Sequence, residues 1–530
     1  MYDLLVTGGR LIDGSGAPSR AADIAVRDGR IAAIGNLQGE SAARTIEADG
    51  RVVAPGFIDS HSHADVAVVA EPTAPAKSRQ GVTTEIVGNC GWTTFPRGPV
   101  DAGAYEKLAR PIFGHPTTPW SWDDLDGYNR HLRHAGVGVN VASLVGHGSV
   151  RSAVMGFEDR PPTAGELARM QAHVQDAMDA GAVGLSTGLC YPPGIYSDIE
   201  EVSELARVAA RAGAPYVTHL RDQVDQLIGS VAEAIEIGRR SGGAIVVSHH
   251  KTIGARNFGK VRWTLQMLDE AHAKGQRTYC DTYPYIQGAS TMVSILPPWL
   301  VAGGVEAMLT RLADPDSRAR VARDFQTGLP GWENRVEAVG WHNIILSYTV
   351  SGKNHDLEGL DVAAAAAKRN KDPLDFVLDL MIDERCEVGR QIVNSCEEDL
   401  RMVMTHPRCM IGSDGIDVGS RPHPRQYGTF PRILDEYVRN KHVLALETAI
   451  HKMSGLTSDV FSLDGIGYLR EGYYADLVVF DPERVTDNAT FGEPRRHPDG
   501  IDWVFVGGVA SVADGRSTGD CNGRVVGRRH

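Results

Sequence analysis

The sequence predicts an α/β fold, in which a (β/α)8 TIM-like barrel is joined to a small β-sandwich domain formed from both termini. A chain of 530 residues is too long for one ordinary core, so a large domain with a smaller one is expected. Strands alternate with helices in the middle of the chain, and short strands with Gly turns occur at both ends. We therefore expect the barrel over residues 55–467, between two sandwich segments at 1–54 and 468–530.

The N-terminal segment consists of short apolar runs separated by tight turns. Asp28-Gly29 lies between two apolar alternations, which is a strong hairpin signal. A few short strands cannot bury their own faces, so they need partner strands. Runs of the same kind recur near the C-terminus, at residues 477–480, 503–506 and 509–512. The two ends of the chain are therefore predicted to share one sandwich.

Alternating strands and helices characterise the central segment. Strands are predicted near residues 183–186, 216–219, 245–249 and 278–281, and helices near residues 163–180, 197–212, 224–240 and 261–274. Thr163 and Glu166 have the spacing of a capping box at the start of the first of these helices. Repetition of strand and helix with short loops predicts a parallel sheet, and its length favours a closed barrel.

The alternation is interrupted between about residues 286 and 345, where Pro-rich stretches suggest an insertion with small helices of its own. The insertion follows a barrel strand, and the loops after barrel strands line the active face. A lid or pocket wall is favoured over an excursion that only adds stability.

Composition limits the partners. The net charge of −13 and the lack of a Lys/Arg-rich block argue against nucleic-acid binding. No signal peptide and no run of about eighteen apolar residues is visible, so a membrane partner is not expected. The 7 cysteines are scattered and do not resemble a disulfide framework. A cytoplasmic enzyme acting on a small molecule is the expectation, and oligomeric state is not readable.

Candidate metal ligands follow the predicted strands. His61 and His63 come directly after an apolar run, and residues i and i+2 of an extended strand point to the same side. Other polar residues stand at strand ends, namely Cys90, His219, His249 and Asp414. Taken singly, each has an ordinary explanation, since a lone Cys is usually a small buried hydrophobe and Ser-Asp-Gly is usually a turn.

Several motifs occur together and in a fixed order. They are Gly-Phe-Ile-Asp-Ser-His-Ser-His-Ala-Asp, Gly-Asn-Cys-Gly, Ser-His-His-Lys, Asp-Thr-Tyr-Pro-Tyr, Gly-Ser-Asp-Gly and His-Pro-Arg-Gln-Tyr-Gly-Thr-Phe-Pro-Arg. Over nearly the whole chain this set resembles the N-acyl-D-amino-acid deacylase (D-aminoacylase) family of the amidohydrolase superfamily. The resemblance implies a metallo-hydrolase barrel, with Gly-Asn-Cys-Gly as its most discriminating motif.

The resemblance also implies a ligand set. Zn²⁺ would be held tightly by Cys90, His219 and His249. A second, weaker site would use His61 and His63, with Cys90 bridging and Asp414 adjacent. Thiolate and imidazole ligands with one open position suit a catalytic zinc. Of the two adjacent histidines after Ser248, the resemblance assigns the ligand to His249 and leaves His250 as structural.

The implied reaction is hydrolysis of the amide bond of N-acyl-D-amino acids by metal-activated water. Asp414 would act as general base and then as general acid. Arg425 matches the family's carboxylate-binding arginine, since guanidinium binds carboxylate in bidentate fashion. Lys251 and Tyr283 match further substrate-binding residues.

Two alternatives remain beside this interpretation. Another C–N hydrolase on the same scaffold, such as a cyclic amidase or an N-substituted formamide deformylase, is one of them; Lys251 and Arg425 favour a substrate with a carboxylate. The other is a catalytically inactive homologue, which the complete ligand set disfavours. One departure leaves fine specificity open, because the chain has Ala289 and then Ser290 where the family often has a serine six positions after the first tyrosine. Preference for D over L substrates comes from the resemblance alone.

Overall fold

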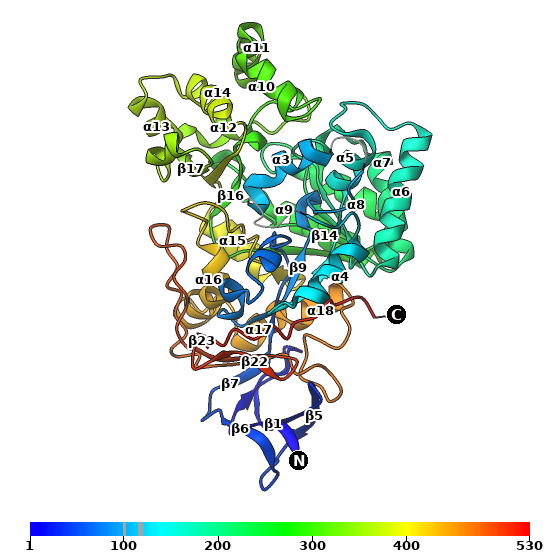
Figure 1. The fold of residues 1–530 in the computed structure, drawn as a ribbon, viewed down its shortest axis with the longest axis vertical. Coiled ribbons are helices and arrows are strands. Elements are labelled where there is room, and N and C mark those ends of the chain that lie inside the picture. Colours follow the sequence, from blue (N-terminus) through cyan, green and yellow to red (C-terminus); the bar gives the residue numbers. More distant parts are fainter. Residues whose placement is uncertain (99–101, 115–119, 530) are drawn as a thin grey trace.

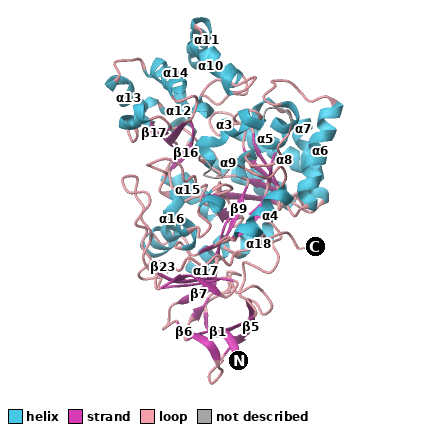
Figure 2. Cartoon of the chain, in the orientation of Figure 1, coloured by secondary structure: helices cyan, strands magenta, loops and turns pink. Residues whose placement is uncertain are grey.

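A barrel of alternating strands and helices occupies the middle of the molecule, with a β-sandwich at one end and a helical excursion at the other (Figure 1). The computed structural model describes residues 1–98, 102–114 and 120–529. Both chain ends contribute strands to the sandwich, which lies at the bottom of Figure 1. The excursion lies at the top, above the carboxyl ends of barrel strands (Figure 2).

The barrel strands form two parallel sheets that continue into one another. The strands are β8 (Phe57–Asp59), β9 (Val82–Val87), β10 (Asn140–Ser143), β11 (Val145–Gly146), β12 (Leu185–Gly188), β13 (Tyr216–His219), β14 (Ile245–Val247), β15 (Thr278–Thr282) and β19 (Cys409–Ile411). Only Leu144 separates β10 from β11. At the other junction, Ser60 N–H donates to the Ile411 carbonyl at 3.4 Å, and Asp414 N–H donates to the His61 carbonyl at 2.7 Å. These bonds bring β8 beside β19, so the predicted (β/α)8 fold is confirmed.

Helices connect the barrel strands. They are α1 (Ala67–Ala70), α2 (Pro75–Ser78), η1 (Asn89–Gly91), α3 (Ala102–Phe113), α4 (Leu125–Ala135), α5 (His147–Met155), α6 (Ala164–Asp179), η2 (Gly194–Tyr196), α7 (Ile199–Arg211), α8 (Leu227–Ser241), η3 (Ala255–Asn257), α9 (Val261–Ala273), α15 (Glu397–Thr405), α16 (Arg425–Arg432), η8 (Ile433–Asn440), α17 (Leu446–Met453) and α18 (Gly455–Val460). The predicted capping box is present at the start of α6, with Thr163 and Glu166 bonded reciprocally.

The sandwich consists of two sheets. Its strands are β1 (Tyr2–Thr7), β2 (Arg10–Leu11), β3 (Arg20–Ala21), β4 (Asp23–Arg27), β5 (Arg30–Gly35), β6 (Ala42–Glu47), β7 (Val52–Pro55), β20 (Leu477–Phe480), β21 (Ile501–Val506), β22 (Val509–Ala513) and β23 (Arg516–Ser517). The 4-stranded sheet has the order β5-β4-β1-β6, and the 7-stranded sheet has the order β23-β22-β21-β20-β7-β2-β3. The hairpin predicted at Asp28-Gly29 joins β4 to β5, and both residues have the positive φ that such a turn needs (52° and 72°).

Strands β7 and β20 connect the sandwich to the barrel. They are antiparallel neighbours, with Val53 opposite Val479 and Val52 opposite Phe480. Val53 and Val479 pack into the sandwich core. Val52 and Phe480 face the other way and pack with Phe57 of the barrel strand β8. Because side chains alternate along a strand, one pair of strands closes two cores.

The C-terminal residues differ from the expected range of 468–530 for the sandwich. After β23 the chain leaves that domain and runs back along the barrel, where Val525 pairs with Val141 of β10. Val526 N–H also donates to the Val141 carbonyl at 2.9 Å. The terminus therefore lies beside the barrel (Figure 1).

The excursion is longer than the predicted 286–345. Its elements are β16 (Gln287–Thr291), η4 (Met292–Ile295), η5 (Pro298–Leu300), α10 (Val305–Ala313), α11 (Pro315–Thr327), α12 (Arg335–Val339), η6 (Trp341–Asn343), β17 (Ile344–Thr349), η7 (Gly352–Leu357), α13 (Val362–Lys368), α14 (Pro373–Asp383) and β18 (Val388–Val393). They include a 3-stranded sheet with β18 in the centre, antiparallel to both β16 and β17. The excursion cannot end before β18, because that strand supplies the hydrogen-bond partners of the other two.

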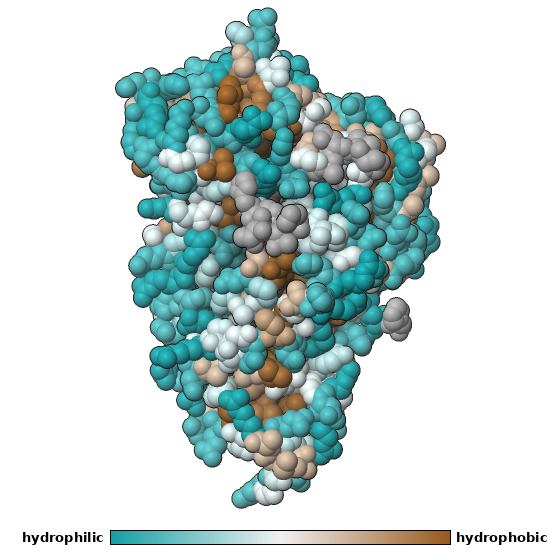
Figure 3. Space-filling model, viewed as in Figure 1, coloured by the Kyte–Doolittle hydropathy of each residue, from teal (hydrophilic) through white to brown (hydrophobic). Residues whose placement is uncertain are grey.

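The face drawn in Figure 3 is mostly hydrophilic, with apolar residues in small scattered groups. Among the described helices, none combines the length and the apolar character that crossing a bilayer requires.

Candidate active site

A cavity lies between the carboxyl ends of the barrel strands and the excursion. The residues lining it include His63, Cys90, His219, His249, Lys251, Tyr283, Arg335, Arg390, Asn394 and Asp414. Barrel strands and the loops after them supply the histidines, the cysteine and the aspartate, whereas Arg335 and Arg390 come from the excursion. This is the end of a (β/α)8 barrel at which active sites are built.

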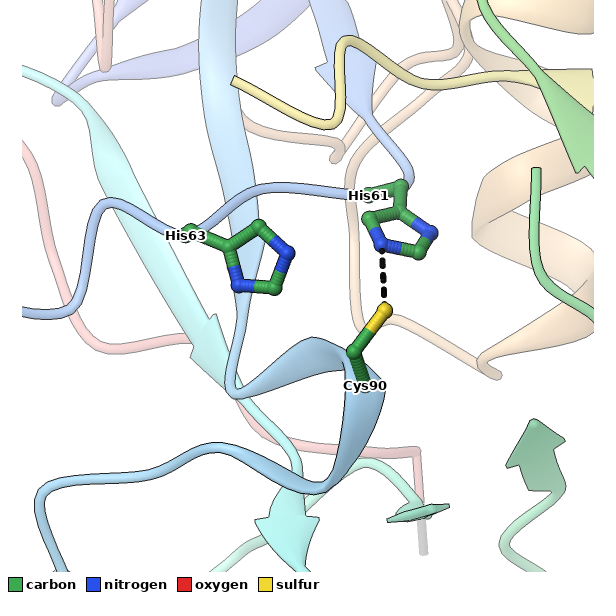
Figure 4. A group of neighbouring side chains, drawn as sticks. All are labelled: His61, His63 and Cys90. Carbon is green, nitrogen blue, oxygen red and sulfur yellow. Dashed lines mark hydrogen bonds between the residues drawn. The ribbon is translucent and has the colours of Figure 1, made fainter. Parts of the chain in front are cut away.

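The thiol of Cys90 is at the centre of a cluster of imidazoles. Its Sγ lies 3.3 Å from His61 Nε2, 3.5 Å from His219 Nδ1 and 3.4 Å from His249 Nε2. Figure 4 shows the approach to His61, with His63 on the same stretch of chain. A tetrahedral zinc with bonds of about 2.0 Å to nitrogen and 2.3 Å to sulfur would separate its sulfur ligand from each nitrogen ligand by roughly 3.5 Å. The donor types and their spacing therefore fit a zinc ion.

A second set of donors adjoins the first. His61, His63 and Cys90 form one compact group, and His61, His249 and Asp414 form another, with ligand atoms within 4.8 Å of one another in each. His63 Nε2 is 3.2 Å from Asp414 Oδ1. The group Cys90, His219 and His249 and the group His61, His63 and Cys90 have Cys90 in common. The arrangement therefore fits two neighbouring metal positions, with Cys90 able to bind at both.

Three of these residues have left-handed backbone conformations. The φ angles are 56° at Cys90, 35° at His249 and 50° at Asp414. This region costs a non-glycine residue about 1–3 kcal/mol, and such residues concentrate at functional sites. Hydrogen bonds hold two of the three: the His249 N–H donates to Asp281 Oδ1 at 2.6 Å, and the Asp414 N–H to the His61 carbonyl.

Asp281 orients two of the histidines. Besides the bond from His249, it lies 3.2 Å from His61 Nδ1. When a carboxylate accepts a hydrogen bond from Nδ1–H, the lone pair of Nε2 is available to bind a metal ion. In His61, Nε2 is the atom that faces Cys90. Asp281 is the first residue of the Asp-Thr-Tyr-Pro-Tyr motif, and no role was predicted for it. Its position at the end of a predicted barrel strand was the available signal.

Beneath the cluster, a buried ion pair joins β8 to the loop after β19. Lys77 Nζ donates to Asp59 Oδ2 at 2.6 Å and to Ser413 Oγ at 2.5 Å. Asp59 Oδ1 also accepts the Ser413 N–H at 2.7 Å. Ser413 precedes Asp414, so this ion pair positions the aspartate relative to the two histidines that follow β8.

Local charges shift the titration of the central groups. Burial raises the pKa of the Cys90 thiol, but His61 and His249 outweigh it and hold that pKa well below its usual range. Burial likewise raises the pKa of Asp414, yet Arg425, with its Nη1 2.9 Å from Asp414 Oδ2, and the nearby histidines bring it well below the ordinary value. A thiolate and a carboxylate are the forms that bind a metal.

Two of the three predicted substrate-binding residues line the cavity, and the third is buried next to Asp414. Lys251 and Tyr283 line the cavity. Arg425 is fully buried behind Asp414, and its guanidinium lies over the Tyr283 ring at 4.5 Å from the ring centre. His250 points away from the cluster, with Nε2 2.8 Å from Thr264 Oγ1, so the structure brings only His249 of the adjacent pair to the site.

Further cavity residues were missed by sequence reasoning, among them Gln223, Arg335, Arg390 and Asn394. Arg335 pairs with Glu333 and lies 3.5 Å from His219 Nε2. Single arginines in a long insertion carried no motif, so only the folded chain places them beside the cluster. The departure noted at Ala289 and Ser290 also falls here, because both residues line the cavity.

The sequence model of the amidohydrolase family matches residues 44–516 of the chain. The chain belongs to the amidohydrolase family. It is 37% identical to the D-aminoacylase of Alcaligenes xylosoxydans xylosoxydans over 99% of this chain and 98% of that relative.

Solved amidohydrolase structures agree. A D-aminoacylase structure described for its binuclear metal centre, with one-metal activation and second-metal attenuation, superposes with a TM-score of 0.85 at 36% identity, covering 100% of both chains. The N-acyl-D-glutamate deacylase of Bordetella bronchiseptica, solved with zinc and a phosphonate mimic of the tetrahedral intermediate, superposes with a TM-score of 0.83 at 35% identity, covering 99% of both chains. The two relatives are about equally similar to this amidohydrolase, so identity does not discriminate between their substrates.

Replacement of Cys90 tests the metal site. We expect Cys90→Ala to lose bound zinc and all turnover, because the thiolate is shared by both donor sets. Cys386→Ala removes another buried thiol outside the cluster and should keep a full metal complement. Zinc per chain is measured by elemental analysis after dialysis. Full zinc occupancy in Cys90→Ala would contradict the assignment.

Proposed function

We propose that this amidohydrolase hydrolyses the amide bond of N-acyl-D-amino acids to a D-amino acid and a carboxylic acid. The observation that carries the proposal is the convergence of the cysteine, the histidines and Asp414 in one cavity whose wall also presents Lys251. The metal-ligand residues on one side of the cavity are those that a metal-dependent hydrolase needs. The cationic Lys251 in the cavity wall can bind the free carboxylate of a substrate. The D configuration is supported by the named activities of the relatives.

Zinc is the proposed metal, held by Cys90, His219 and His249. His61, His63 and Asp414 would hold the second, weaker ion together with Cys90. When bound, zinc polarises an amide carbonyl and makes a water molecule more acidic.

Asp414 is the proposed proton carrier. Its carboxyl is ionised, faces His63 and lies in the cavity wall, so it can accept a proton from a water molecule there. It can then return that proton to the leaving nitrogen, which would otherwise depart as a poor amide anion. The ion pair to Arg425 leaves Oδ1 free of the guanidinium, since Arg425 bonds Oδ2.

Lys251, Tyr283 and Arg425 are the proposed contacts of the substrate carboxylate. Burial lowers the pKa of Lys251 to about 8, so its ammonium still predominates at neutral pH. Arg425 reaches the site through its stacking on Tyr283 and its pairing with Asp414. A cyclic amidase or a formamide deformylase with a neutral substrate would leave Lys251 without an anion.

A paired substrate screen tests the proposal. The zinc-loaded enzyme is incubated with N-acetyl-D- and N-acetyl-L-amino acids of the same side chain, and the released amino acid is quantified. We expect turnover of the D series and little of the L series. Hydrolysis of a hydantoin or an N-substituted formamide, with no turnover of either N-acetyl series, would refute the proposal.

Asp414→Asn separates proton transfer from metal binding. We expect the variant to keep the tightly held zinc and to lose about 10²–10⁴-fold in kcat, the usual contribution of general acid–base catalysis. The change also leaves Arg425 without its ion pair, so urea unfolding must show that the variant is folded under assay conditions. Near-normal turnover would exclude Asp414 as the proton carrier.

Arg425→Lys keeps the charge but loses the planar fork. A charge-assisted hydrogen bond contributes about 1.5–3 kcal/mol, so kcat/KM for an N-acyl amino acid should fall about 10- to 150-fold. An N-acyl amine without the carboxylate is the control substrate and should be affected little. Equal losses on both substrates would mean that Arg425 acts only by holding Asp414.

A further inference from the structure

Among the described residues, three cationic side chains line the cavity and a fourth, Arg425, lies next to it, and they differ in what neutralises them. Arg425 pairs with Asp414, and Arg335 pairs with Glu333. For Lys251 and Arg390, no carboxylate of the described residues lies within ion-pair distance. Lys251 Nζ donates to the His249 carbonyl at 2.9 Å, and Arg390 Nη2 donates to Ser294 Oγ at 2.8 Å. Both remaining cations line the cavity.

Of these two cations, Arg390 is the one whose burial most requires a counter-ion. Its side chain is only 1% exposed, and its Nε has no hydrogen-bond partner in the described structure. Burial, together with the charge of Arg335, lowers the pKa of Arg390 to about 9, which still leaves it charged at neutral pH. A buried charge without a counter-ion is destabilising, and a ligand anion in the cavity would remove much of that destabilisation.

The strand geometry directs Arg390 into the cavity. Arg390, Ile392 and Asn394 alternate along β18 and the residue after it, and all three line the cavity. Residues i, i+2 and i+4 of a strand share one face, so this face is the cavity wall. Ser290 of β16 is directly opposite Arg390 and lines the same wall. The side chains of such a pair lie side by side, which places a hydroxyl next to the guanidinium.

Resting on the proposed function, we infer that Arg390, with Ser290 and Ser294, forms a second carboxylate subsite, so that this enzyme prefers N-acyl-D-amino acids bearing a second carboxylate. The first carboxylate is the α-carboxylate, which neutralises Lys251. The second carboxylate binds the planar guanidinium of Arg390, whose geometry suits a carboxylate. On the same face of β18 and the residue after it, the apolar Ile392 lies between Arg390 and Asn394. The second carboxylate can belong to the amino-acid side chain or to the acyl group.

Substrate pairs that differ by one charge test the subsite in the unmodified zinc enzyme. N-acetyl-D-glutamate is compared with N-acetyl-D-glutamine for the side chain, and N-succinyl-D-leucine with N-acetyl-D-leucine for the acyl group. We expect kcat/KM to favour the dianionic member by about 10- to 150-fold in one of the pairs, as for other charge-assisted hydrogen bonds. The responding pair identifies the position of the second carboxylate.

Two variants connect that preference to Arg390. Arg390→Gln should abolish the preference by lowering kcat/KM much more for the dianionic members than for the monoanionic members, and Arg390→Lys should restore part of the preference. Because Arg390 is buried, Ser294→Ala serves as a milder change that removes a hydrogen-bond partner of the guanidinium and should reduce the preference without abolishing it.

The outcomes distinguish this inference from the proposed function. Turnover of the monoanionic substrates with no preference for either dianionic partner would overturn the second subsite and leave the deacylase function intact. A preference that persists in Arg390→Gln would overturn the assignment to Arg390. No turnover of any N-acyl-D-amino acid would overturn both.

Discussion

The buried ion pair between Lys77 and Asp59 is the interaction on which the site depends. Asp59 ends β8 and Ser413 follows β19, and the carboxylate of Asp59 accepts bonds from both Lys77 and Ser413. Backbone hydrogen bonds also cross this junction, from Ser60 to Ile411 and from Asp414 to His61, and the side-chain contacts add to them in holding the two strands together. Removing one partner of a buried pair typically costs about 3–5 kcal/mol. In this protein the damage would fall on the relative position of His61 and Asp414.

Strain and support are combined at the same end of the barrel. Cys90, His249 and Asp414 have backbone conformations that are unfavourable on their own, and backbone N–H hydrogen bonds to Asp281 and His61 hold His249 and Asp414 in place. The thiol, imidazole and carboxylate therefore converge before any substrate binds. Preorganisation of this kind lets a cluster of like and unlike charges exist at fixed distances of a few ångströms, with the histidines and Arg425 keeping Cys90 and Asp414 ionised.

Much of this arrangement was predictable because it depends on local sequence. The capping box at Thr163, the hairpin at Asp28 and the strand ends carrying His219 and His249 are each specified by a few neighbouring residues. Features that depend on distant pairing were not predictable. Asp281 orients His61 across 220 positions, and the length of the excursion follows from the pairing of β18 with strands far from it in sequence. Arg390 belongs to this second class.

The division of labour between the barrel and the excursion has a consequence for substrate choice. The metal ligands proposed above belong to the barrel, whereas Arg335 and Arg390 belong to the excursion, whose strand β18 pairs with both β16 and β17. A mutation in that small sheet can reshape the wall of the cavity and leave the ligand positions undisturbed. The cavity wall and the proposed metal ligands are thus encoded by different segments of the chain, so we expect a graft of the excursion from a relative to alter substrate choice while keeping the ligands.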